Sequence, residues 1–93
     1  MDKQIITNCK MYINDADNNN FKNYILELIT HTPSDYRLSY EYIFQQVYIH
    51  ACLKKNAALA QWLKEEVYTK HFDCVQQIAL KHVFNYGNFI LRK

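Results

Sequence analysis

The chain has 93 residues and a formal net charge of +2, and 49% of its residues are hydrophobic, including eight tyrosines and five phenylalanines. This length is that of one small domain, and the apolar content excludes a disordered chain. The eleven basic residues are spread along the sequence singly or in pairs, which excludes a long basic tract for nucleic acid or anionic membranes.

The N-terminal third of the chain predicts two amphipathic helices that form an irregular pair. Apolar residues recur at helical spacing over residues 5–13 and again over residues 21–29. The polar stretch 14–20 separates the two segments, and Asp17 or a neighbouring asparagine can cap the second helix. This helix ends before Pro33, because a proline displaces the preceding residue from helical geometry.

The middle third predicts a second pair of helices that meet at Asn56. The third helix can be capped by Ser34 and Asp35, and it runs to about Lys55. Its apolar stripe consists of Phe44, Val47, Tyr48, Ala51 and Cys52. After Asn56, a fourth helix places Trp62 and its apolar neighbours on one face.

The fifth helix has an apolar stripe that repeats the third-helix stripe 31 residues later. This predicted stripe consists of Val75, Ile78, Ala79, His82 and Val83. The same shift carries Asn56 onto Gly87, and both residue types readily take the left-handed conformation that ends a helix. We therefore predict a repeating unit of helix, stop and second helix, with a last short helix after Gly87. A chance alignment of two amphipathic helices is the alternative.

These patterns predict an all-α fold, a single helical domain over residues 1–93 made of about three stacked helix-turn-helix pairs. The irregular N-terminal pair covers residues 1–32, the second pair residues 34–69 and a truncated third pair residues 71–93. With one glycine and one proline in the chain, few positions suit the turns of a β-rich fold.

The segment HACLKKNAALAQWL, residues 50–63, resembles a helix, short stop and Trp-Leu helix of the divergent ankyrin repeats found in large DNA viruses. It is most similar to the multigene-family proteins of African swine fever virus, and the segment ALKHVFNYGNFIL is similar in the same way. The resemblance covers about residues 41–93. It departs from standard ankyrin repeats because the Thr-Pro-Leu-His opening is missing and Lys55-Asn56 replaces a Gly-His pair.

This resemblance implies a short ankyrin-like helical repeat domain in a viral protein. Its implied partner is a host protein, and its implied role is modulation of host innate immune signalling from the host cytoplasm. The location also agrees with the sequence itself. The chain has no apolar run near the ~20 residues of a membrane span, no signal-peptide core at its N-terminus, and three cysteines that cannot all pair.

Residues outside the predicted apolar stripes, and those at the predicted stops, are the candidates for contact with a partner. They are Tyr36, Tyr42, Gln45, Gln46, Lys54, Lys55, Gln76 and Gln77. By contrast, Tyr40, Phe44 and Tyr48 are expected to pack in the core. The end of the stack is also a candidate surface for self-association into a homodimer.

The sequence predicts no metal site, no cofactor and no catalytic centre. A structural zinc site needs four converging ligands and usually a Cys-x-x-Cys pair, which this chain lacks. A cysteine nucleophile needs a base, an orienting group and an oxyanion hole, and no such constellation stands out. The predicted function is therefore a non-enzymatic protein–protein interaction module. A small helical nucleic-acid-binding regulator is the alternative.

Overall fold

The computed structural model describes the backbone of residues 2–31 and 37–92 and the side chains of residues 3–30 and 41–92. This part of the chain is helical apart from short turns and contains no strand, which confirms the all-α prediction. The elements in chain order are α1 (Asp2–Asn14), α2 (Asn18–His31), α3 (Arg37–Leu53), α4 (Ala57–Trp62), the π-helical segment η2 (Leu63–Tyr68), α5 (Thr69–His71) and α6 (Cys74–Arg92).

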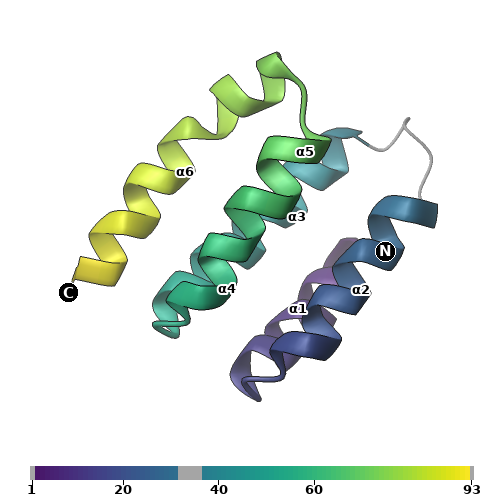
Figure 1. Cartoon of the computed structure of the whole chain (residues 1–93), viewed down its shortest axis with the longest axis vertical. Coiled ribbons are helices and arrows are strands. Elements are labelled where there is room, and N and C mark those ends of the chain that lie inside the picture. Colours follow the sequence, from purple (N-terminus) through teal and green to yellow (C-terminus); the bar gives the residue numbers. More distant parts are fainter. Residues whose placement is uncertain (1, 32–36, 93) are drawn as a thin grey trace.

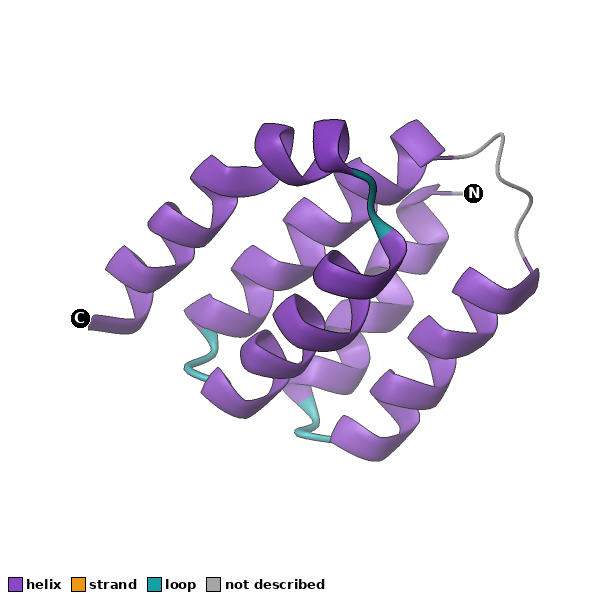
Figure 2. Ribbon diagram, turned by 45° about the horizontal axis from the view of Figure 1, so that its top comes forward, coloured by secondary structure: helices purple, strands orange, loops and turns teal. Residues whose placement is uncertain are grey.

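The helices form two layers around α3. α3 packs against α1 on one side and α6 on the other, and it also packs against α4. Figure 1 shows α2 in front of α1 and the continuous run α4–η2–α5 in front of α3, and Figure 2 shows the short turns that join each pair.

α3 and α6 run in the same direction, as Figure 1 shows. The ring of Phe44 contacts that of Phe72, just before α6 begins, with centroids 5.4 Å apart. At the other end of the two helices, the Lys55 Nζ donates a hydrogen bond to the backbone oxygen of Ile90. The N-terminal ends of α3 and α6 therefore lie at one end of the molecule, and their C-terminal ends lie at the other.

The N-terminal pair follows the sequence prediction closely. Asp17 caps α2, because its Oδ1 accepts from the backbone N–H of Asn20 at 3.4 Å and its Oδ2 accepts from the amide of the same residue at 2.7 Å. Cys9 and Phe21 are fully buried where α1 and α2 join the core. The predicted cap and the predicted apolar faces of both helices are confirmed.

The turn between α3 and α4 differs by one residue from the prediction. Lys55, with φ of 59°, takes the left-handed conformation, whereas Asn56 has φ of −90°. Asn56 is instead the N-cap of α4, and its Oδ1 accepts from the backbone N–H of Leu59 at 3.1 Å. Its Nδ2 donates to the Oδ1 of Asn18 at 3.0 Å and so links this turn to the start of α2.

α6 continues without interruption from Cys74 to Arg92, so the predicted stop at Gly87 and the separate short helix after it are wrong. Gly87 lies inside the helix and has no positive φ. A Cβ atom at this position would lie 2.5 Å from the Cε1 of Tyr48 and 2.9 Å from the Sγ of Cys52. The glycine therefore permits a close approach of α6 to α3 and does not end a helix.

The predicted apolar stripe of the fifth helix is also wrong, because α6 turns a different face to the core. The buried residues of α6 are Gln76, Leu80, Val83, Phe84, Gly87 and Ile90. Of the predicted stripe, only Val83 is buried. The ring of Phe84 meets the ring of Tyr48 at a centroid distance of 5.0 Å and is nearly perpendicular to it. With Phe84 packed in the core, α6 is rotated about its axis so that most of the predicted apolar face points away from the core.

An aromatic cluster joins α3 to the C-terminal half of the molecule. The Phe44 ring lies 5.7 Å from Tyr48, 6.2 Å from Tyr68 and 6.0 Å from Phe84, in addition to its contact with Phe72. Aromatic pairs at such distances stabilise a core beyond the burial of their area. The expected core positions of Phe44 and Tyr48 are confirmed, whereas the side chain of Tyr40 lies outside the described residues.

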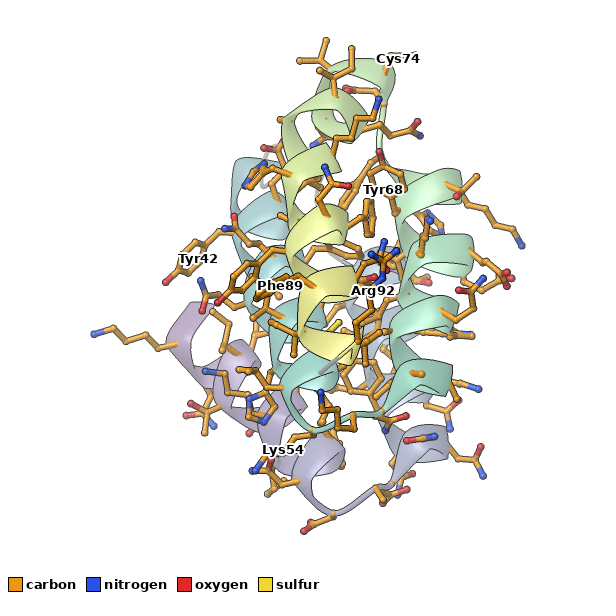
Figure 3. The ribbon with its side chains drawn as sticks, turned by 90° about the vertical axis from the view of Figure 1, so that its left-hand side faces the viewer. Tyr42, Lys54, Tyr68, Cys74, Phe89 and Arg92 are labelled. Carbon is orange, nitrogen blue, oxygen red and sulfur yellow. The ribbon has the colours of Figure 1, made fainter. Side chains whose placement is uncertain are left out.

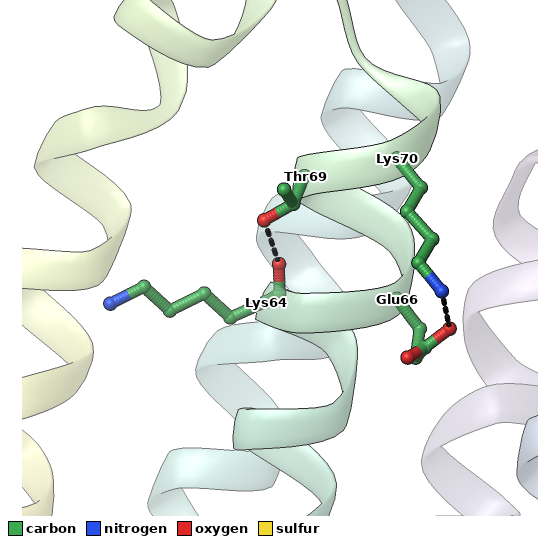
Figure 4. A network of polar contacts seen from close by, with 4 residues as sticks. All are labelled: Lys64, Glu66, Thr69 and Lys70. Atoms are coloured by element: carbon green, nitrogen blue, oxygen red, sulfur yellow. Dashed lines mark hydrogen bonds and ion pairs between the residues drawn. The ribbon is translucent and has the colours of Figure 1, made fainter.

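The segment η2 winds more widely than an α-helix. The backbone N–H and the Oγ1 of Thr69 both bond the carbonyl oxygen of Lys64, with the Oγ1 at 2.9 Å (Figure 4). In the same run, Glu66 and Lys70 form an exposed ion pair at 2.7 Å, which adds little to stability. At the end of η2 the Tyr68 hydroxyl donates to the carbonyl oxygen of Gln77 at 2.6 Å and so fixes this segment to α6.

Candidate interaction surface

α6 carries a second row of residues, apolar except for His82, on the side that faces away from the core. The row, which we call the α6 stripe, consists of Val75, Ile78, Ala79, His82, Tyr86 and Phe89. At 3.6 residues per turn, these six residues span an arc about 100° wide, which is the usual width of a core-facing helix surface. α6 is therefore apolar on two sides, and the described part of the chain buries only one of them.

The side chains of the α6 stripe are open to solvent. Val75 is 76% exposed and Ile78 is 73% exposed. Tyr86 and Phe89 are more than half exposed, and Ala79 is exposed as well. Single exposed apolar residues are common on protein surfaces, but a contiguous row along one helix is typical of a surface that binds a partner.

Two exposed residues of α3 extend the stripe sideways. Tyr42 and Leu53 are both more than half exposed, and they lie on one face of α3 because they are about three helical turns apart. α3 and α6 pack side by side, and Figure 3 shows Tyr42 on the same side of α6 as Phe89. We call the α6 stripe together with Tyr42 and Leu53 the outer face.

The charged residues of α6 lie beside the outer face. Lys81 and Arg92 share the polar side of α6, and α6 contains no acidic residue. Lys54 follows α3 and, with Lys10 of α1, lowers the pKa of His50 in addition to burial, so Lys54 lies toward α1. The outer face thus has an apolar centre beside a polar side of α6.

Four of the residues predicted to bind a partner lie on α3 or directly after it. Tyr42 and Lys54 are exposed, and Gln45 and Gln46 are half-buried on α3. Tyr36 lies outside the described residues. The structure therefore leaves Tyr42 and Lys54 as the predicted residues most open to contact.

The remaining three predicted residues have structural roles. Gln76 is only 5% exposed and completes the start of α6, since its Oε1 accepts from the backbone N–H of Asp73 at 3.1 Å while its own N–H donates to the Asp73 carboxylate at 2.9 Å. Gln77 donates to the carbonyl oxygen of Phe72 at 2.9 Å. The ammonium of Lys55 is held by the backbone of α6. The expectation that Gln76 and Gln77 face a partner is therefore corrected.

The α6 stripe itself was not among the predicted contact residues. Four of its six members were assigned to the core because they recur at core spacing. A signal was nevertheless present, since the sequence of α6 is apolar at Leu80, Phe84 and Ile90 as well as at Val75 and Ile78. A helix with apolar residues on both sides has either two packed faces or one face left for a partner.

The ionisable groups near the core show no feature of an activated centre. Burial raises the pKa of the Cys9 thiol to about 12, and burial followed by the neighbouring Cys52 raises the pKa of Tyr48 to about 12. Burial also raises the pKa of Cys52. A cysteine nucleophile requires a lowered pKa, so these buried thiols resemble core residues.

His50 is half-buried on α3. Burial lowers the pKa of this imidazole, with further lowering by Lys10 and Lys54, and the ring bonds the Oδ1 of Asn14 at 2.9 Å. This pairing connects α3 to the end of α1. Across the described ranges 2–31 and 37–92, no group of three or more His, Cys, Asp or Glu residues could hold a metal ion.

The described helices also lack a segment with the length and apolar content needed to cross a membrane. No protein-family model, no curated protein and no solved structure matches the chain.

Proposed function

We propose that this chain is a non-enzymatic protein–protein interaction module of the stacked-helix, ankyrin-like type, which binds its partner through the outer face. The observation that carries the proposal is the α6 stripe, with Val75 and Ile78 about three-quarters exposed beside a separate, fully packed face of the same helix. Removing apolar surface from water contributes about 25 cal/mol per Å² to the free energy of binding, so a partner that covers this row forms a more stable complex.

The resemblance to viral ankyrin-like repeats supplies the class of partner. On this basis the partner is a host protein, and binding modulates host innate immune signalling in the host cytoplasm. The module needs no cofactor for this role, because apolar burial and a polar rim are sufficient for binding.

A nucleic-acid-binding regulator is the alternative, and the placement of the cations does not favour it. Lys22 lies 5.8 Å from the centroid of the Trp62 ring, and Lys64 lies 5.3 Å from that of Phe84. These cations lie against aromatic rings of the chain itself. A phosphate-binding surface would instead present several cations in a stripe.

The proposal is tested by capture of protein partners from host-cell lysate on the tagged chain, after nuclease treatment, with identification by mass spectrometry. Wild type is compared with Ile78→Glu, which places a charge in the α6 stripe. Asn88→Glu is the matched control, because it adds the same charge at an exposed position on the polar side of the same helix. We expect a protein partner that survives nuclease, is retained by Asn88→Glu and is lost with Ile78→Glu.

Two results would contradict this proposal. If the captured material disappears on nuclease treatment and binding falls steeply with salt, the nucleic-acid alternative is correct. If Ile78→Glu retains every partner that wild type captures, the outer face is not the binding surface. Circular dichroism of both variants is the check that each is still folded.

A further inference from the structure

We propose that a second copy of this chain docks on the outer face, with the two α6 helices antiparallel and related by a two-fold axis. This inference rests on the proposed function, because a second copy would cover the same outer face that binds the host protein, and the two would compete for it. It is carried by three properties of the outer face: the direction of its two helices, the order of its side-chain sizes and its area.

The helix dipoles favour a second copy in the antiparallel orientation. α3 and α6 run in the same direction, so the positive ends of both dipoles lie at one end of the outer face. A two-fold axis perpendicular to α6 places that end of each copy on the opposite end of the other. The parallel orientation would instead bring like ends of the helix dipoles together.

The order of side-chain sizes favours the same orientation. The N-terminal half of the α6 stripe has the smaller residues Val75, Ile78 and Ala79, whereas the C-terminal half has the rings of Tyr86 and Phe89. His82 lies midway between Val75 and Phe89. Antiparallel pairing centred on His82 therefore sets each ring against a smaller aliphatic side chain, which is the self-complementarity that a two-fold interface requires.

The available area is close to what a specific dimer needs. With about 200 Å² for a fully exposed large apolar side chain, the exposed fractions of Val75, Ile78, Tyr86 and Phe89 provide roughly 500 Å² per copy. Tyr42 and Leu53 raise this to roughly 700 Å², compared with the ~800 Å² per partner of a standard interface. The dimer therefore uses α3 as well as α6, and it is expected to be weak and reversible.

Sedimentation velocity and light scattering from about 1 to 200 μM test the oligomeric state. We expect a concentration-dependent monomer–dimer equilibrium for wild type. Ile78→Glu should weaken the dimer at least ~10-fold, because it buries an unpaired charge in the interface. The matched variant Asn88→Glu should dimerise as wild type does.

Disulfide cross-linking in a Cys74→Ser background tests the orientation. Val75→Cys alone and Phe89→Cys alone should each remain uncross-linked, because antiparallel pairing holds identical ends apart. An equimolar mixture of the two proteins should form a covalent dimer under mild oxidation, since Val75 of one copy faces Phe89 of the other. Cys9 and Cys52 are buried and do not interfere.

The possible failures are distinguishable. A chain that stays monomeric at every concentration overturns the inference about a second copy. If Ile78→Glu still abolishes capture of a different protein, the proposed function survives that result. A dimer in which Val75→Cys cross-links to itself, with none formed in the mixture, overturns the antiparallel arrangement.

Discussion

At the scale of single residues, Gly87 shows how a close helix contact can outweigh helix propensity. Alanine is favoured over glycine by about 1 kcal/mol in a helix interior. At an exposed helix position, replacing glycine with alanine would therefore stabilise the protein. Here the added methyl group would overlap the ring of Tyr48 and the sulfur of Cys52. Overpacking of this kind costs about 1–3 kcal/mol. We expect a net loss of about 1 kcal/mol, measured as a fall of roughly 4–8 °C in the melting temperature.

The exposed residue next to Gly87 provides the control for that measurement. Asn88→Ala changes the same helix by a substitution that also improves propensity, and it should raise stability by a few tenths of a kcal/mol. A Gly87→Ala protein as stable as Asn88→Ala would show that the contact between α6 and α3 is looser than described.

Cys9 and Tyr48 make the folded state sensitive to alkaline pH. Burial raises the pKa of Cys9 from 9.0 to about 12, and that of Tyr48 rises from 10.0 to about 12. The folded state therefore holds both protons more tightly than the unfolded chain does. The part of the unfolding free energy that comes from holding these two protons is fully present below about pH 9 and is lost as the pH rises toward 12. We expect the unfolding free energy, measured by urea denaturation, to fall between about pH 9 and about pH 11.

The exposed thiol serves as the comparison in this pH series. Cys74→Ser should show the same fall in unfolding free energy as wild type, because Cys74 is exposed. Unfolding free energies that stay constant from about pH 8 to about pH 11 would be inconsistent with burial of the Cys9 thiol.

At the scale of elements, the turn between α3 and α4 divides two tasks between adjacent residues. Lys55 takes the left-handed conformation and Asn56 caps α4. Asn56→Ala should lower stability by about 1 kcal/mol, since the Leu59 N–H loses its acceptor. Asn56→Asp should retain most of the stability, because aspartate caps equally well. The measurement is chemical denaturation of wild type, Asn56→Ala and Asn56→Asp. If the two substitutions had similar effects on stability, Asn56 would have no capping role in this turn.

The elements that were predicted well are those with local signals. Asp17 follows a polar stretch and precedes a regular apolar period, so both the cap and the helix could be read from neighbouring residues. The face of α6 could not, because Val75 and Leu80 are equally apolar and the choice between their faces depends on contacts with α3. The role of Gly87 likewise depends on Tyr48 and Cys52, which are distant in sequence.

At the scale of the whole molecule, Phe44 connects α3 to η2, to the residue that follows α5, and to α6. Its ring contacts those of Tyr48, Tyr68, Phe72 and Phe84. Phe44→Ala should therefore lower the unfolding free energy by about 3–5 kcal/mol, as expected for loss of a buried aromatic ring. Tyr42→Ala, two residues earlier on the exposed side of α3, should change it by less than about 0.5 kcal/mol. Similar losses in both variants would contradict the assigned faces of α3.

The candidate surface was only partly predictable for a related reason. Tyr42 was identified because it falls outside a well-defined apolar stripe on α3. Gln76 and Gln77 were selected by the same criterion, but their polar groups are used to start α6 and to bond Phe72. A glutamine bound to backbone and a glutamine open to a partner look alike in sequence, and only the fold separates them.

The wide turn of η2 has a consequence for the lengths that this chain can tolerate. A π-helical turn contains about one residue more than an α-helical turn. Deleting one exposed residue there, such as Glu65, would let the segment wind as a regular α-helix while Tyr68 stays on its side of the molecule. Loops are normally where proteins accept deletions. In this molecule the middle of a helical run is the place where a shorter chain is expected to fold to the same shape.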